Sequence, residues 1–450
     1  MKLGVNIVRK IIRQRLAFLL TLLMVFSMFG QPVAVNAEDS LDLNAESAIL
    51  VDAESGKILY SKKADMTLPP ASMTKMMTEY LVWEALEAEE ISWEETTEIS
   101  DYAFEISANP DFSGVGLYQN VEYTVRELYE AMAINSDNAT TIALAELIAG
   151  SEGEFVKMMN EKAEEMGLQE YQFVNSSGLE NSSLGDNYPE GTEPDGTNLL
   201  SARSAALLAY HLVTDYPESL DISSMPEFEF DDKTIENWNW MLPHEASYLQ
   251  PFHYEGVDGL KTGFTSLAGY SFTGTAERDE VRLISVVMKA DSVEERFNET
   301  AKLLDHGFSS FSNEEIFPVG YQLEDESEIP VVKGKEKLVE IETAGNFERM
   351  IQKGEEENYE IIYKLDESLL TDDGELVAPI EKGEVVGTAE LVLKDGEETY
   401  IFDEQKQETV ELVTTSDVEK SNWFMITLGA IGDFFSNVYH KVVNTVKGWF

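Results

Sequence analysis

Three short segments carry side chains that suit acyl transfer on a serine. They are Ser72-Met73-Thr74-Lys75, Ser136-Asp137-Asn138 and Lys261-Thr262-Gly263. Each segment alone is weak evidence, because a serine and a lysine three residues apart occur by chance in many chains of this length. Their joint occurrence in this order is far more specific. The sequence therefore predicts a serine nucleophile served by a lysine.

The spacing of the first segment has a physical reason. Residues three apart in a helix lie on one face, so the Lys75 amine can reach the Ser72 hydroxyl. An alcohol is a poor nucleophile until a neighbour takes its proton, and Lys75 must be neutral to do so. Burial and the nearby cation Lys261 favour that neutral form. The five histidines are scattered and no G-x-S-x-G elbow surrounds a serine, so a Ser-His-Asp triad is the poorer explanation.

The other two segments supply groups that a peptide substrate needs. We expect Ser136 and Asn138 on a loop between two helices, where the hydroxyl relays a proton and the amide binds the substrate backbone. Lys261 and Thr262 can hold a terminal carboxylate, and Gly263 leaves room for the substrate. In isolation, the first of these segments equally fits a helix N-cap and the second a solvated strand end.

A tetrahedral intermediate also requires two hydrogen-bond donors for its oxyanion. The backbone N–H groups of Ser72, at a predicted helix start, and of Phe264, just after the glycine, are the natural candidates. Each such donor lowers the barrier by about 3 kcal/mol.

The surrounding pattern predicts an α+β domain with an antiparallel sheet and helices. Pro69-Pro70 precede a helix that we expect from Ser72 to about Glu89. Helical patterns dominate residues 125–212, apart from a polar loop at 175–198. The expected strands and closing helix are Ala48–Val51, Lys57–Tyr60, Gly256–Gly263, Ala268–Thr275, Val281–Ala290 and the helix Val293–Phe308.

Changes in the sequence pattern divide the chain into four parts. Short β-type runs punctuated by glycines predict a small all-β domain after the first domain. These runs are Ile329–Val332, Leu338–Glu342, Tyr359–Tyr363, Val385–Leu393 and Thr399–Phe402. The expected parts are a signal at 1–37, the catalytic domain at 38–312, the all-β domain at 313–413, and a linker with a terminal helix at 414–450.

The N-terminal residues indicate export. Five cations precede the apolar run Leu16–Phe29, and small residues at Val35-Asn36-Ala37 suit a cleavage point. The alternative is an uncleaved membrane anchor, for which the apolar run is short. We therefore expect an exported protein acting at the outer face of the cytoplasmic membrane.

The last thirty residues, Ser421 to Phe450, have an amphipathic helical pattern. Apolar residues from Ile431 to Trp449 recur every three or four positions, with polar residues on the opposite face. A net charge of +1 and aromatic residues at both ends suit a membrane interface. The alternative is a helix docked on the β domain.

Composition excludes several other classes of function. The chain has 450 residues, with 32 Lys and Arg against 85 Asp and Glu, and its net charge of −53 repels nucleic acid. Its acidity fits solubility or a saline or alkaline habitat. There is no cysteine, and the histidines lack paired spacing, so we expect no metal and no cofactor.

These residues resemble the low-molecular-mass penicillin-binding proteins, the serine-type D-Ala-D-Ala carboxypeptidase family. The resemblance extends from about Ala48 to Phe308 and includes four further stretches besides the three segments. They are Leu68–Ser72, Phe155–Gly167, Phe173–Leu179 and Val257–Thr265. It implies the transpeptidase-like fold shared with serine β-lactamases, followed by a β domain and an amphipathic tail.

The resemblance also implies an activity. Ser72 would be acylated by the penultimate D-Ala carbonyl of a peptidoglycan stem pentapeptide, terminal D-Ala would leave, and water would hydrolyse the acyl-enzyme. β-Lactams would mimic the substrate and stall at the acyl stage. Two positions depart from the family: Ser136-Asp137-Asn138-Ala139-Thr140 replaces a common S-G-N-D-A, and Phe264 replaces a frequent His.

Two other functions compete. A serine β-lactamase shares the three segments but uses a deacylating Glu in an E-x-x-L-N setting, which Glu161, Glu164, Glu165 and Glu170 lack. A non-catalytic β-lactam sensor or wall scaffold would be expected to have an output domain or to have lost Ser72 or Lys75.

Overall fold

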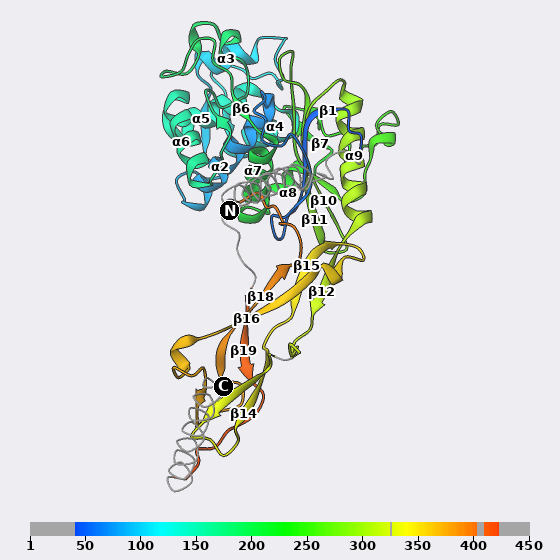
Figure 1. Cartoon of the computed structure of the whole chain (residues 1–450). Coiled ribbons are helices and arrows are strands. Elements are labelled where there is room, and N and C mark those ends of the chain that lie inside the picture. Colours follow the sequence, from blue (N-terminus) through cyan, green and yellow to red (C-terminus); the bar gives the residue numbers. More distant parts are fainter. Residues whose placement is uncertain (1–40, 325, 403–408, 423–450) are drawn as a thin grey trace, which may run out of the picture. The chain divides into compact units, whose positions relative to one another are not determined.

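The catalytic domain is built around a five-stranded antiparallel sheet (Figure 1). The computed structural model describes residues 41–324, 326–402 and 409–422. The strand order is β2-β1-β11-β10-β9, so the N-terminal hairpin pairs with the last strand of the domain. The strands are β1 (Ala45–Asp52), β2 (Ile58–Lys62), β9 (Val257–Thr265), β10 (Gly269–Arg278) and β11 (Val281–Ala290). The predicted α+β class and these predicted strands are confirmed.

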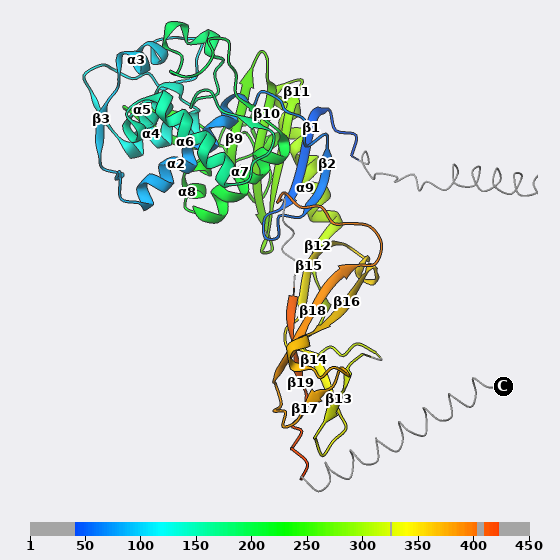
Figure 2. The same cartoon turned by 60° about the vertical axis from the view of Figure 1, so that its left-hand side comes forward.

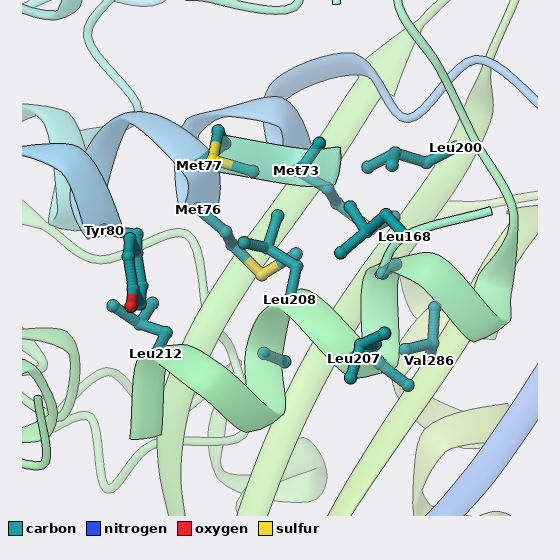
Figure 3. Packing of buried hydrophobic residues seen from close by; sticks show 14 of the residues in the cluster. Met73, Met76, Met77, Tyr80, Leu168, Leu200, Leu207, Leu208, Leu212 and Val286 are labelled. Carbon is teal, nitrogen blue, oxygen red and sulfur yellow. The ribbon is translucent and has the colours of Figure 1, made fainter. Parts of the chain in front are cut away.

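Helices cover both faces of this sheet (Figure 2). Side chains alternate along a strand, so Leu50 of β1 faces opposite to Ile49 and Val51. Leu50 lies against Gly307 of α9 (Val293–Ser310). Ile49 and Val51 belong to a core with residues of α2 (Lys75–Glu87) and α7 (Ala202–Asp215). Figure 3 shows residues of this cluster, in which Met76 of α2 lies beside Leu208 of α7.

A second core lies within the helices inserted between β2 and β9. It is built mainly on α4 (Val125–Asn135) and α5 (Asn138–Ala149), whose buried apolar residues pack against the far side of α2. The other helices and short strands are β3 (Thr96–Glu98), α3 (Asp101–Ser107), β4 (Glu122–Thr124), α6 (Glu152–Glu165), β5 (Tyr171–Gln172), β6 (Leu199–Leu200), α8 (Ser219–Ser223), β7 (Glu227–Phe230) and β8 (Lys233–Glu236). The predicted polar loop contains the short 3₁₀ turns Asn181–Ser183 and Gly185–Asn187.

The serine lies in a tighter turn than the sequence predicted. The 3₁₀ turn η1 (Ala71–Thr74) contains Ser72, and the α-helix begins only at Lys75. Ala71 has φ of +48°, a left-handed conformation that costs a non-glycine residue about 1–2 kcal/mol. The backbone immediately before the serine is therefore strained and must be held by its neighbours.

Two glycines allow neighbouring segments to hold this turn. A Cβ on Gly178, which has φ of +87°, would lie 1.9 Å from the Ala71 carbonyl oxygen. A Cβ on Gly263 of β9 would lie 2.4 Å from the Pro70 carbonyl oxygen. Besides the expected room for substrate, Gly263 therefore has a packing reason: it lets β9 approach the serine turn.

The second domain is all-β, as predicted. Its main sheet has the order β16-β18-β19-β14-β13-β17, and β12 pairs separately with β15. The strands are β12 (Phe311–Phe317), β13 (Glu328–Val332), β14 (Leu338–Thr343), β15 (Phe347–Gln352), β16 (Tyr359–Leu365), β17 (Leu376–Val377), β18 (Val385–Leu393) and β19 (Thr409–Thr414). Strands β12, β15, β17 and β19 were not predicted.

The predicted strand Thr399–Phe402 is not part of that sheet. Tyr400 instead forms an isolated β-bridge with Lys57, and the Ile401 N–H donates to the Gly56 carbonyl. Lys57 is buried there against Glu398, at 2.5 Å. This run therefore pairs with the β1–β2 turn of the catalytic domain.

Two predicted segments lie outside the described residues: the export signal at 1–37 and the amphipathic pattern from 423 onward. Within the described ranges, no helix is long and apolar enough to cross a membrane.

Replacing Gly178 should test the packing of the serine turn. We expect Gly178→Ala to lower the free energy of unfolding by about 3 kcal/mol or more, because it adds steric overlap to left-handed strain. Gly150 is the matched control, since it has φ of +78° and a Cβ added there would meet no atom within 4 Å. Gly150→Ala should cost only about 1 kcal/mol. Equal losses in urea unfolding of the two variants would contradict this account.

Candidate active site

The Lys75 side chain is buried directly beneath Ser72. Its Nζ lies 3.0 Å from Ser72 Oγ, 2.8 Å from Asn138 Oδ1 and 2.6 Å from the Ser177 carbonyl oxygen. The serine is on η1, the lysine opens α2, the asparagine opens α5, and Ser177 is in the polar loop. Four segments of the chain thus meet at one nitrogen.

These three partners suit a neutral amine. The Ser177 carbonyl and Asn138 Oδ1 can only accept hydrogen bonds, so they take the two N–H groups of a neutral Lys75. The remaining lone pair then faces the Ser72 hydroxyl, which can donate. Burial, followed by repulsion from Lys261, places the pKa of Lys75 well below its ordinary value. The arrangement can therefore remove a proton from Ser72.

Ser136-Asp137-Asn138 forms the junction between α4 and α5, and the Ser136 hydroxyl has no hydrogen-bond partner among the described residues. Ser136 ends α4 in the left-handed region with φ of +63°, and Asp137 caps α5 by accepting from the Thr140 N–H at 2.8 Å. The N-cap interpretation therefore holds for Asp137, while Asn138 contacts Lys75. Ser136 is 4% exposed, and its Oγ has no hydrogen-bond partner among the described residues. A buried hydroxyl of this kind is ready to bond a ligand.

The third segment lies on β9, the edge strand of the sheet next to the serine turn. Lys261 and Thr262 are buried, whereas Phe264 is 51% exposed and stacks on Tyr270 with ring centroids 4.3 Å apart. Burial lowers the pKa of Lys261 to about 8, although Glu79 acts in the opposite direction. No hydrogen bond among the described residues joins Thr262 or Phe264 to Ser72 or Lys75.

Several residues near the site were missed by sequence reasoning. The Asn198 amide donates to Thr74 Oγ1 at 3.0 Å and to the Asn175 carbonyl at 3.0 Å, which ties the polar loop to the serine turn. Arg296 of α9 is buried, and its guanidinium lies 3.4 Å from the Gly263 carbonyl oxygen. Only the Phe173–Leu179 stretch gave any signal, as part of the family resemblance.

Glu79, also missed, and Asp137 and Glu152 are buried carboxylates close enough to Lys75 to raise its pKa. They counter the burial that lowers it.

A separate cavity of about 1060 Å³ contains none of the predicted site residues. Trp83, Trp93 and Tyr216 line it together with many acidic side chains. Because the lining of this cavity includes neither Ser72 nor Lys75, it gives no support for the catalytic assignment. That assignment rests on the geometry of the side chains around Ser72. The described residues bring no three His, Asp or Glu side chains together in a group able to hold a metal ion.

The fold and this site define a class: a serine acyl-transfer enzyme of the penicillin-binding type, with a lysine beside the nucleophile. Residues 33–292 match the peptidase S11 family, described as D-alanyl-D-alanine carboxypeptidase. Residues 311–420 match the C-terminal domain of penicillin-binding protein 5. The chain belongs to the low-molecular-mass penicillin-binding proteins of the S11 family, whose members are serine-type D-Ala-D-Ala carboxypeptidases.

Individual relatives agree with this assignment. The chain is 34% identical to the D-alanyl-D-alanine carboxypeptidase DacF of Bacillus subtilis, over 78% of this chain and 82% of that protein. It is 31% identical to DacC of Escherichia coli, over 92% and 94%. The crystal structure of the peptidoglycan synthesis regulatory factor PBP3 of Streptococcus pneumoniae superimposes with a TM-score of 0.67 at 36% identity, covering 83% of this chain and 99% of that one. Penicillin-binding protein D2 of Listeria monocytogenes, solved with cefotaxime bound, has a TM-score of 0.51 at 33% identity, covering 59% and 98%.

Charging Asn138 should shift the pH dependence of acylation. Asn138→Asp places an anion where Oδ1 lies 2.8 Å from Lys75 Nζ, so the Lys75 pKa should rise by about one to two units. The rate of acylation by a labelled penicillin should then fall about tenfold or more at pH 7 and recover at higher pH. Asn346→Asp in the β domain is the control, and it should leave the profile unchanged. A loss that no increase in pH restores would contradict a role through Lys75.

Proposed function

We propose that the chain removes the terminal D-Ala from peptidoglycan stem pentapeptides through an acyl-enzyme on Ser72. The observation that carries this assignment is the buried Lys75 amine, 3.0 Å from Ser72 Oγ, with its two other neighbours being acceptors. The family membership supplies the substrate class.

The reaction begins with attack of Ser72 on the substrate. Its Oγ bonds to the penultimate D-Ala carbonyl carbon while its proton passes to Lys75. The C–N bond to the terminal D-Ala breaks, and the proton reaches the leaving amine through Ser136. Water then attacks the ester, giving the free acid and regenerating Ser72. The N–H groups of Ser72 and Phe264 stabilise the oxyanion in both steps, by about 3 kcal/mol each.

The remaining groups bind the peptide. Asn138 holds the substrate amide, and Lys261 with Thr262 binds the terminal carboxylate. β9 is the edge strand of the sheet, where an extended peptide can align, and Gly263 lets that strand lie close to the serine turn. Burial of Lys261 strengthens its attraction for a carboxylate, because solvent screens it little.

The β-lactamase alternative requires a base that deacylates quickly. Glu161, Glu164 and Glu165 lie exposed on α6, and Glu170 is exposed just after it. None of them makes a hydrogen bond with Ser72 or Lys75 in the described part of the chain. These positions favour a long-lived β-lactam adduct.

Removing the nucleophile tests the function directly. Wild type should form a persistent adduct with labelled penicillin and release D-Ala from a peptide ending in D-Ala-D-Ala. Ser72→Ala should lose both activities by at least about 10³-fold, because no other group can form the ester. Mass spectrometry of the adduct locates the label. Rapid turnover of the lactam by wild type, or labelling that survives in Ser72→Ala, would overturn the proposal.

We also propose that the protein is exported through the signal at 1–37 and held at the membrane surface by the amphipathic residues of 414–450. The basis is the sequence pattern alone. Residues up to Asn422 should be kept in any test of the tail, because Val418 pairs with Ile380 and Lys420 with Gly334 in the β domain.

Truncation after Asn422 should therefore release the protein from membranes without altering the site. We expect wild type in the membrane fraction and the truncated chain in the soluble fraction, with equal labelling by penicillin. A truncated chain that is labelled normally yet remains in the membrane fraction would refute the tail as the anchor.

A further inference from the structure

Glu79 is a buried carboxylate that the proposed mechanism does not use. It lies on α2, four residues after Lys75, so these two side chains share one face of that helix. Its side chain is 3% exposed. It therefore lies in the interior of the domain, one helical turn further along α2 than the lysine.

The hydrogen bonding of Glu79 is sparse for a buried acid. The Tyr129 hydroxyl of α4 approaches Oε2 at 3.5 Å, a long contact, and Oε1 has no partner among the described residues. Burying a carboxylate with so few donors is costly unless nearby cations offset the lost hydration. The charged form of Glu79 is favoured by Lys261 and, when its amine is protonated, by Lys75.

The balance of these effects places the pKa of Glu79 close to neutral pH. Burial raises the pKa of Glu79 to about 7, against the opposing influence of Lys261, Tyr129 and Lys75. The pKa of Lys261 lies at about 8, because burial lowers it and Glu79 holds it up. The charges of Glu79 and Lys261 thus depend on one another.

We propose that Glu79 is a positioning residue that sets the charges of the two catalytic lysines, keeping Lys261 protonated while Lys75 works as a neutral amine. This inference rests on the roles proposed above for Lys75 and Lys261. The two lysines need opposite protonation states within one buried site, and each repels the proton of the other. A single anion nearby helps Lys261 to keep its proton while Lys75 stays neutral.

Other charged groups also face this region and contribute to its field. Asp137 at the start of α5 and Glu152 of α6 act on Lys75, and Arg296 of α9 acts on Lys261. Asp137 and Glu152 already accept hydrogen bonds from backbone N–H groups, of Thr140 and of Ser176. Among the described residues no backbone N–H donates to the Glu79 side chain, and its charged form is favoured by Lys261, then by the Tyr129 hydroxyl and by Lys75.

Removing the negative charge of Glu79 should change the pKa values of both lysines in the same direction. A carboxylate stabilises the protonated form of both lysines, so Glu79→Gln lowers both pKa values. Deprotonation of Lys75 sets the acidic limb of the activity profile, and loss of the Lys261 proton sets the alkaline limb. The profile should therefore move to lower pH, and it should move most on the alkaline side, where Glu79 is charged. A merely structural defect would reduce activity at every pH without moving the limbs.

The experiment follows kcat and KM for a D-Ala-D-Ala peptide, and the rate of acylation by labelled penicillin, from about pH 5.5 to 9.5. For Glu79→Gln we expect the alkaline limb to shift by about one unit or more toward acid. The acidic limb should shift less, because Glu79 is largely protonated below its pKa of about 7. At about pH 8.5, kcat/KM should fall about tenfold, mainly through KM, whereas at about pH 6.5 it should stay within about twofold of wild type.

Two further variants complete the comparison. Tyr129→Phe removes a donor that favours the charged form of Glu79, so it should move the profile in the same direction by less. Glu299→Gln on α9 removes another buried carboxylate, which pairs with Lys302, and should leave both limbs in place. If Glu79→Gln fails to fold, the Tyr129→Phe profile decides the question.

The outcomes separate this inference from the proposed function. Wild type without a Ser72 adduct would refute the function and the inference together. Wild type with the adduct, and variants whose limbs coincide with those of wild type, would refute the role of Glu79 while leaving the function intact.

Discussion

The buried contact between Lys75 and Ser72 is the constraint on which the catalytic domain depends. An amine acts as a base at neutral pH only when its pKa is lowered, which burial does most strongly for Lys75, and a buried amine needs acceptors for its N–H groups. The Ser177 carbonyl and Asn138 supply them from two separate segments. The polar loop and α5 must therefore both be in place before Ser72 has a competent base.

Close packing of backbone then fixes the serine itself. Ala71 is held in a left-handed conformation by segments that come so near that only glycine fits at Gly178 and Gly263. Asn198 reinforces the same turn through Thr74. The nucleophile is thus positioned by a loop on one side and an edge strand on the other, and the sheet fixes that strand.

The sequence was informative wherever the signal was local. Ordered motifs identified the family, and alternating apolar runs predicted β1, β2 and β9–β11 to within a few residues. Contacts between residues far apart in the chain left no recognisable pattern in the sequence. Glu79 looks like an ordinary polar position in a helix, and the acceptor at Ser177 is a backbone carbonyl that any residue provides. The run Thr399–Phe402 has a valid β pattern, but its partner is the β1–β2 turn rather than the β domain.

The acidity of the chain makes the location of its few cations important. A net charge of −53 opposes a substrate that ends in a carboxylate, yet exposed charges farther than about 10 Å are largely screened by salt. Lys261 and Arg296 are both buried around the serine turn, where screening is weak. The local field that a substrate meets is therefore set by these cations and by the carboxylates directly beneath them. The negative charge of Glu79 reduces the positive potential of the site but does not abolish it. The surface can therefore be acidic while the site still attracts an anion.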